Sequence, residues 1–257
     1  MARRVFRVAT GLVCTLIACA PDTARAFGDV GAFEARPLLV GDQSSARRAS
    51  ALALWATELT NRTSAPARAK PREVRASDDA LFDAPFAYWS DNRELSPLSR
   101  AEIGNLRRFF ALGGMLFVDD AAPGAEGPGA FGQYARRELA RVLPDMAPTS
   151  LPKDHVLYRT FYIVRRPEGR TGNVKPLEVL SRSGKIKVIF SSHDVAGAVA
   201  QSPHGGWENR LEGGEPQRER ALRLLVNIAM YVLCSNYKDD QVHAPSLMRK
   251  RGLSPTP

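Results

Sequence analysis

Short apolar runs alternate with segments of helical periodicity along most of this chain, and that alternation limits the fold more than any other feature. Segments whose apolar residues recur every three or four positions separate the apolar runs at 37–41, 86–89 and 115–118. Parallel neighbouring strands need a long crossover between them, and a helix usually supplies it. We therefore predict an α/β fold, with one domain at 37–236 built on an open, mostly parallel sheet flanked by helices.

Serine residues predict where two of the helices begin. Ser99 is followed three residues later by Glu102, which is the spacing of a capping box. Ser44 or Ser45 is predicted to cap an earlier helix that runs to about residue 60, because a serine side chain accepts a hydrogen bond from the first free backbone N–H groups of a helix.

The second half of the chain carries three further predictions. The aromatic stretch 158–164 is typical of a strand, and two more strands are expected at 177–180 and 187–191, joined by a Ser-Gly turn. The last helix, at 217–234, is apolar on nearly all sides in its second half, as expected of a helix buried against a sheet. Cys234 is therefore predicted to be buried and unreactive.

Residues 1–26 have the three parts of an export signal. Arginines precede an apolar stretch at 8–20, and Ala24-Arg25-Ala26 supplies a cleavage site. At about 1.5 Å of helix per residue, that stretch is too short to cross a hydrocarbon core of roughly 30 Å. We predict an exported, periplasmic protein with a linker at 27–36. In the alternative, lipidation of Cys19 makes it an inner- or outer-membrane lipoprotein.

The formal net charge of +9, from 36 Lys+Arg against 27 Asp+Glu, is a weak indication of nucleic-acid binding. Removing residues 1–26 leaves 32 basic and 26 acidic residues, a net charge of +6. The remaining arginines are dispersed, apart from a short cluster in the polar and basic tail at 237–257. We expect no nucleic-acid partner, and membrane contact only if Cys19 is lipidated. Three cysteines also exclude a disulfide-dense scaffold.

Five spaced motifs occur in order between residues 82 and 231. They are Phe82-x-x-Pro85-Phe86-x-x-Trp89, Leu106-Arg107-x-Phe109-x-x-x-Gly113-Gly114-x-Leu116-x-x-Asp119-Asp120, His155-x-x-Tyr158, Phe190-x-x-x-Asp194 and Asn227-x-x-x-Tyr231. Together they resemble the family called domain of unknown function 4159, and the likeness covers most of 37–234. The resemblance implies a sheet like that of class I glutamine amidotransferases, which is flavodoxin-like. It implies an architecture far more than a reaction.

Amidotransferase chemistry would need a cysteine directly after a central strand, and this chain has none after the run 115–118. Those enzymes place a cysteine nucleophile on a turn after a central strand, and a histidine after a later strand activates it. Here the run 115–118 ends in Asp119-Asp120, and Ser191-Ser192-His193-Asp194 resembles only the histidine end of such a site. We therefore expect neither glutaminase activity nor a cofactor.

Polar side chains at strand ends are the candidates for a ligand site, because open α/β sheets bind ligands at the carboxyl ends of their strands. The candidate set, completed by a histidine in a turn and a tryptophan in a glycine-rich loop, is Asp119, Asp120, His155, His193, Asp194 and Trp207. The alternative for these residues is structural. Carboxylates at such positions also cap helices and accept bonds from backbone N–H groups.

Two functions follow from these candidates. The first is a non-catalytic module of the cell envelope that binds a small ligand or an envelope protein at the strand ends. The alternative is a hydrolase, with or without a divalent metal, that uses Asp119, Asp120, His193 and Asp194 in the same cleft. The sequence contains no H-x-H, H-E-x-x-H or C-x-x-C spacing that would indicate a metal site.

Overall fold

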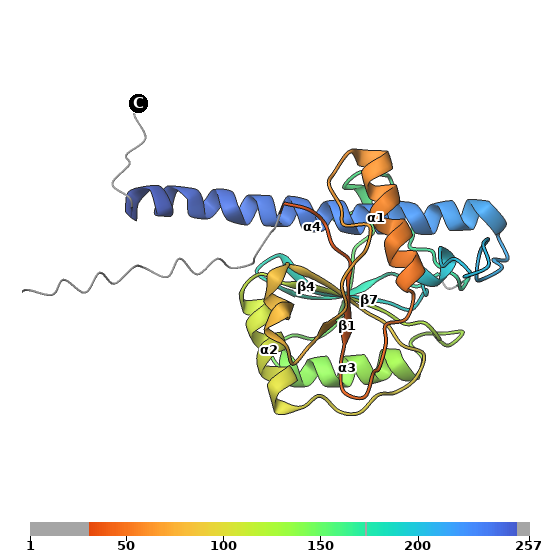
Figure 1. Ribbon diagram of the computed structural model, residues 1–257, viewed down its shortest axis with the longest axis horizontal. Helices are drawn as coiled ribbons and strands as arrows, with labels where there is room; N and C mark the ends of the chain where they lie inside the picture. Colours follow the sequence, from red (N-terminus) through yellow and green to blue (C-terminus); the bar gives the residue numbers. More distant parts are fainter. Residues whose placement is uncertain (1–30, 173, 251–257) are drawn as a thin grey trace, which may run out of the picture.

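In the part of the chain that the computed structural model describes, residues 31–172 and 174–250, seven strands form one mixed sheet in the order β2-β1-β3-β4-β7-β6-β5 (Figure 1). Side chains are described as far as residue 235. The strands are β1 (Arg36–Leu39), β2 (Val74–Arg75), β3 (Phe86–Trp89), β4 (Met115–Asp119), β5 (Thr149–Ser150), β6 (Glu178–Arg182) and β7 (Lys185–Ser191). Strands β2, β1, β3, β4 and β7 are parallel, and β6 and β5 extend the sheet antiparallel at one edge. This sheet confirms the predicted α/β fold.

Helices cover both faces of the sheet. The α-helices are α1 (Ala49–Thr63), α2 (Arg100–Ala111), α3 (Ala130–Val142) and α4 (Gly214–Lys250), and the short 3₁₀ helices are η1 (Asp79–Asp83), η2 (Val156–Arg159) and η3 (Ala196–Ala198). Helices α1 and α4 lie on one face, and α2 and α3 lie on the other (Figure 1). The central strands are therefore buried on both sides, as their unbroken apolar runs predict.

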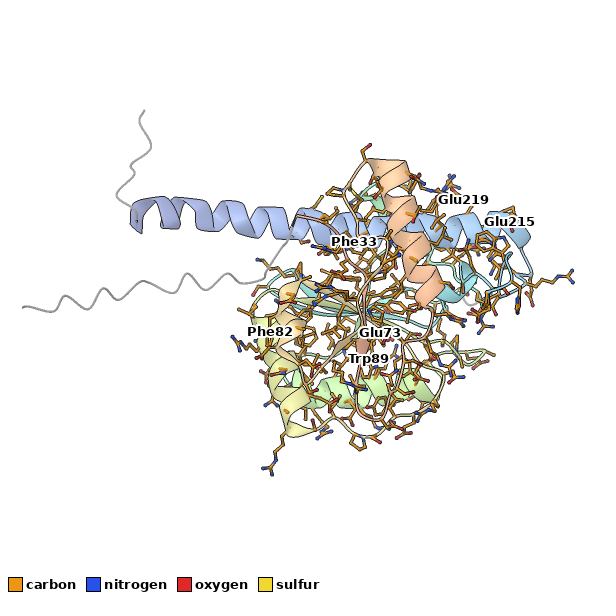
Figure 2. The ribbon with its side chains drawn as sticks, in the orientation of Figure 1. Phe33, Glu73, Phe82, Trp89, Glu215 and Glu219 are labelled. Atoms are coloured by element: carbon orange, nitrogen blue, oxygen red, sulfur yellow. The ribbon has the colours of Figure 1, made fainter. Side chains whose placement is uncertain are left out.

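The two faces have separate aromatic cores because side chains alternate along each strand. On the face of α1 and α4, Trp55 packs against Phe33, with ring centroids 5.1 Å apart. On the face of α2 and α3, the Trp89 ring meets Phe131 edge-on at 5.3 Å. Figure 2 labels one residue of each core, Phe33 and Trp89.

Of the two predicted helix starts, one is confirmed and one is wrong. Ser99 caps α2 through a capping box, in which its side chain accepts from the backbone of Glu102 and the Glu102 side chain accepts in return. Helix α1, however, begins at Ala49, later than a cap at Ser44 or Ser45 implies, and its N-cap is Arg48 in the left-handed region at φ 66°. The loop between β1 and α1 is therefore longer than predicted, and it reaches the candidate site.

The predicted strand at 158–164 is wrong, because that stretch forms η2 and a loop against α4. Asn227 of α4 holds the loop: its Oδ1 accepts from the backbone N–H of Phe161 at 3.3 Å and of Tyr162 at 2.8 Å, and its Nδ2 donates to the Tyr162 carbonyl. The backbone groups that would pair with a strand are thus bound by a helix side chain. Aromatic content alone does not distinguish the two outcomes.

Helix α4 differs from its prediction at both ends. It begins at Gly214 and continues to Lys250 through much of the segment expected as a polar tail, and Figure 1 shows this second half extending past the sheet. Adding residues to an existing helix avoids the cost of nucleation, so a polar sequence can continue one. Cys234 is exposed rather than buried, which corrects the second prediction for this helix. Among the described residues, every helix is either too short or too polar to cross a membrane.

Candidate functional site

The order of the strands places a crevice between the carboxyl ends of β1 and β3. The chain leaves β1 to form β2 on one side and returns to form β3 on the other. The two connections depart in opposite directions, which leaves an opening above the strand ends. Open α/β sheets bind their ligands at this kind of switch point.

A cleft of about 450 Å³ occupies that position. It is lined by the loop between β1 and α1, by the loop after β3 and by one residue of the segment before α4, and its lining residues are Gln43, Ser44, Ser45, Ala46, Arg47, Arg48, Asp91, Arg93 and Glu208. All but one of these side chains are polar or charged. The cleft is therefore suited to a polar ligand rather than an apolar one.

Gln43 forms the inner wall of the cleft and ties two strand ends together. Its Oε1 accepts from the backbone N–H of Val40 at 3.1 Å and from the indole N–H of Trp89 at 3.2 Å. Its Nε2 donates to Asp91 Oδ2 at 2.9 Å, and Arg47 donates to the other oxygen of that carboxylate at 3.3 Å. The ends of β1 and β3 thus form a rigid frame for the loops around them.

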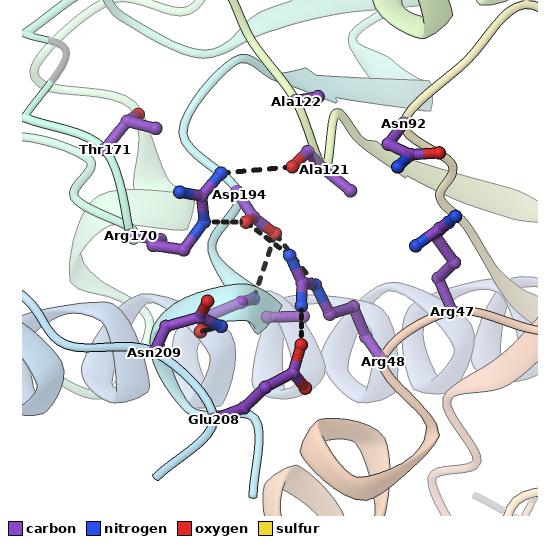
Figure 3. Close-up of polar contacts among 12 residues, drawn as sticks. Arg47, Arg48, Asn92, Ala121, Ala122, Arg170, Thr171, Asp194, Glu208 and Asn209 are labelled. Carbon is purple, nitrogen blue, oxygen red and sulfur yellow. Dashed lines mark hydrogen bonds and ion pairs between the residues drawn. The ribbon is translucent and has the colours of Figure 1, made fainter. Parts of the chain in front are cut away.

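Arg48 connects the cleft to the buried Asp194 beneath it (Figure 3). Its Nε and one terminal nitrogen donate to the two oxygens of Asp194 at 3.1 and 2.7 Å, and its other terminal nitrogen donates to Glu208 Oε1 at 2.8 Å. Arg170 also donates to Asp194, and it reaches the carbonyl of Ala121 at 3.1 Å. Asp194 is fully buried, and the guanidinium groups of Arg48 and Arg170 both bind its carboxylate beneath the cleft.

Asp119, at the end of β4, holds the segment that follows β7. Its two oxygens accept from the backbone N–H groups of Val195 at 3.0 Å and Ala196 at 2.9 Å, and the Tyr88 hydroxyl lies 3.2 Å from Oδ2. Burial, followed by the negative charge of Asp194, raises the pKa of Asp119 to about 7. The side chain is fully buried, and its hydrogen bonds fix the backbone at the start of η3.

Asp120 points to the opposite face of the sheet and organises the start of α3. Its oxygens accept from the backbone N–H groups of Ala122 at 3.1 Å and Gly129 at 2.7 Å, and burial raises its pKa. A Cβ at Gly132 would lie 2.5 Å from Oδ2, so the close approach of α3 depends on that glycine.

The two histidines among the predicted residues lie in different places. His193 is fully buried, with Nε2 2.9 Å from the carbonyl oxygen of Lys175. His155 caps η2, where Nδ1 accepts from Leu157 at 3.1 Å, and burial lowers its pKa. Its ring lies 5.9 Å from that of Tyr231, which bonds to Ile186 near the start of β7, so His155 is at the other end of the sheet from the cleft.

Trp207 is 41% exposed beside the cleft, and Arg218 lies 4.1 Å from its ring centroid. Its neighbour Glu208, rather than the indole, lines the cleft. The structure therefore brings Asp119 and Asp194 together at η3, separates Asp120 onto the other face and places His155 elsewhere. Within the described ranges, no group of three His, Cys, Asp or Glu residues could hold a metal ion.

Gln43, Arg48 and Asp91 are site residues that sequence reasoning missed. One signal could have indicated them, because the loop after the first strand and the loop after its new neighbour flank the switch point in any fold of this type. That signal depends on the order of the strands in the sheet, which local sequence patterns do not contain.

Comparison with known proteins bears on the whole domain rather than on the cleft. No curated protein matches the chain. The family described as domain of unknown function (DUF4159) matches residues 38–233, which is most of the chain and nearly all of the sheet and its helices. The chain belongs to this family.

Proposed function

We propose that this protein is a non-catalytic binding module of the cell envelope that holds a small polar ligand in the cleft between the ends of β1 and β3. The observation that carries the proposal is the position of the cleft, because a polar hollow of about 450 Å³ lies at the switch point of an open α/β sheet. Its volume falls in the range of roughly 300–1,000 Å³ that small-molecule sites occupy.

The chemistry of the strand ends supports binding rather than catalysis. Asp119 and Asp120 follow β4, where the resemblance to amidotransferases would place a nucleophile, and the oxygens of both accept bonds from backbone N–H groups. A carboxylate engaged in this way is directed toward its own chain. The envelope location belongs to the proposal through the export signal at 1–26, which lies outside the described residues, with lipidation of Cys19 as its alternative.

A hydrolase is the second candidate, and one observation favours it. A carboxyl group whose pKa is about 7, as at Asp119, is suited to general acid–base catalysis at neutral pH. Asp119 is fully buried, however, and a general acid or base must come within hydrogen-bond reach of its substrate. The binding module is therefore the preferred proposal.

The test is ligand-induced thermal stabilisation of the full chain by a panel of amino acids, sugars, nucleotides, dicarboxylates and inorganic phosphate. Ser45→Trp fills the cleft, and Ser181→Trp adds the same side chain at an exposed position on β6. We expect at least one compound to raise the Tm of the wild type and of Ser181→Trp but not of Ser45→Trp. Stabilisation by no compound, or stabilisation that survives Ser45→Trp, would contradict the proposal.

A further inference from the structure

We infer that the ligand of this cleft carries a carboxylate or phosphate group, which binds Arg48 in the place that the Glu208 side chain now occupies. This inference rests on the proposed function, because it assigns a ligand class to the same cleft. Three features of the structure support it: the fixed orientation of Arg48, the charges around it and the exposure of Glu208.

Asp194 orients the guanidinium group of Arg48, and this orientation does not depend on Glu208. Asp194 binds Nε and one terminal nitrogen, which is the two-point geometry that fixes the plane of an arginine. The remaining terminal nitrogen is directed to the Glu208 carboxylate at 2.8 Å (Figure 3). A donor that is already held in place loses little freedom when an anion binds to it.

Glu208 is the second carboxylate that binds Arg48, next to the buried Asp194. Arg48 and Arg170 both bind Asp194, so two positive charges face one buried negative charge. Elsewhere in the lining, Arg47 is paired with Asp91, and Arg93 is paired with Asp42 next to the cleft. The Glu208 carboxylate therefore adds a second negative charge beside these two arginines, and a ligand anion at the same nitrogen of Arg48 would form the same ion pair.

Glu208 is the replaceable member of this group. Its side chain is 47% exposed, whereas that of Arg48 is 11% exposed and that of Asp194 is fully buried. Its backbone is fixed, because its N–H donates to the Ala200 carbonyl at 2.8 Å and the next residue, Asn209, donates to Gly197 at 2.9 Å. Exchange with a ligand therefore needs only a rotation of the Glu208 side chain, and the loop can keep its position.

Trp207 provides a local signal for the position of this loop. It is the residue before Glu208 and is 41% exposed, whereas Trp55 and Trp89 are fully buried. Quenching of tryptophan fluorescence by a solute such as acrylamide therefore reports chiefly on Trp207. Because the loop can keep its position, Tm reports the binding of the anion, and a change in quenching reports a movement of the loop next to Glu208.

The experiment titrates the full chain with inorganic phosphate and, separately, with succinate, with chloride as the control at equal ionic strength. Quenching and Tm are both recorded. Glu208→Gln removes the competing carboxylate and leaves the side chain's shape. Glu212→Gln removes another exposed carboxylate of the same loop, which does not line the cleft. We expect Glu208→Gln to bind one of the two anions about fivefold more tightly than the wild type, because the anion no longer competes with an exposed ion pair. Glu212→Gln should bind it as the wild type does.

The possible results separate this inference from the proposed function. Equal anion affinity in the wild type and Glu208→Gln overturns the inference, as does a gain of the same size in Glu212→Gln. If both anions fail in all variants while an uncharged compound still stabilises the wild type and not Ser45→Trp, the inference fails and the proposed function stands. If no compound of any class binds, both fail.

Discussion

Two layers of polar side chains lie at the carboxyl ends of the parallel strands, and they differ in what surrounds their charges. The inner layer, Asp119, Asp120, His193 and Asp194, is buried, and its carboxylates bind backbone N–H groups and arginines of the same chain. The outer layer is the lining of the cleft, where Arg47, Arg93 and Glu208 are half exposed. Their side chains can exchange a partner without exposing a buried charge.

A carboxylate at a strand end is therefore not in itself a ligand site. Burying a charge is favourable only when it is paired, so the inner acids hold the loops that shape the cleft. Ligand exchange is easier for groups that are partly solvated and already oriented. Arg48 connects the two layers, because it binds Asp194 on one side and Glu208 on the other. Substitutions in the inner layer should therefore lower stability, and those in the outer layer should alter binding.

The largest effect is expected from Asp194→Asn. It leaves Arg48 and Arg170 without the buried charge that they share, and losing one partner of a buried pair costs about 3–5 kcal/mol. Asparagine tolerates the left-handed backbone at this position, where φ is 51°, so the charge is the main change. Urea denaturation measures the loss. Glu208→Gln removes a partner of the same arginine in the outer layer and should cost only about 0–1 kcal/mol.

Asp119→Ala is expected to come next. It deprives the backbone N–H groups of Val195 and Ala196 of their acceptor, and an unsatisfied buried donor costs about 1–3 kcal/mol. Asp145→Ala, at an aspartate 80% exposed, is the control and should lie within about 0.5 kcal/mol of the wild type. If both variants unfold at the same urea concentration, the bonds of Asp119 to Val195 and Ala196 do not stabilise the fold.

The pKa of Asp119 predicts a pH dependence with a definite sign. Because this pKa rises from 3.8 to about 7 on folding, the folded protein keeps a proton that the unfolded chain releases above pH 4. The group's contribution to stability is therefore present at low pH and lost as the pH rises toward 7. Asp119→Asn cannot titrate, so its free energy of unfolding should fall less between pH 5 and pH 7 than that of the wild type. Parallel pH profiles would show that Asp119 does not titrate in this window.

Asp120→Asn should have a smaller effect, confined to the other face of the sheet. The amide keeps one acceptor oxygen for the N–H groups of Ala122 and Gly129, and losing a bond at a helix N-terminus costs about 1 kcal/mol. Hydrogen exchange should rise at the start of α3 and stay unchanged at η3. Faster exchange at η3 would mean that the two aspartates do not act on separate faces.

The smallest effect on stability is expected from Arg93→Ala in the outer layer. Arg93 and its partner Asp42 are 53% and 46% exposed, and such pairs contribute about 0–1 kcal/mol. Its Tm should therefore stay close to that of the wild type, while the affinity for an anion in the cleft falls. A large loss of Tm would mean that Arg93 supports the fold, as the inner layer does.

Much of the fold could be predicted because it depends on local signals. The alternation of strands and helices, the buried strands at 86–89 and 115–118 and the capping box at Ser99 are all properties of neighbouring residues. The stretch 158–164 could not be predicted, since the conformation of its backbone depends on Asn227, far along the chain. The extension of α4 past Cys234 likewise depends on a helix that is already formed.

The site could be predicted only as an edge of the sheet. Strand-end acids indicate that edge, and the cleft does lie there, but which side chains face solvent depends on distant partners. Asp119 meets Val195 across 76 positions, and Arg48 meets Asp194 across 146. No local pattern contains those pairings. A ligand-binding role for Asp119, Asp120, His155, His193, Asp194 and Trp207 stays a prediction, and their structural bonds are what the structure adds.

Hydrogen–deuterium exchange of the full chain, with and without a saturating concentration of a compound that stabilises it, distinguishes the roles of the two layers. If the cleft binds and the inner layer only supports it, protection should increase at 43–48, 91–93 and 207–209, the segments around the cleft. It should change little at 119–120 and 193–197. Protection that increases at the inner layer and leaves the cleft segments unchanged would mean that the inner layer, and not the cleft, binds the compound.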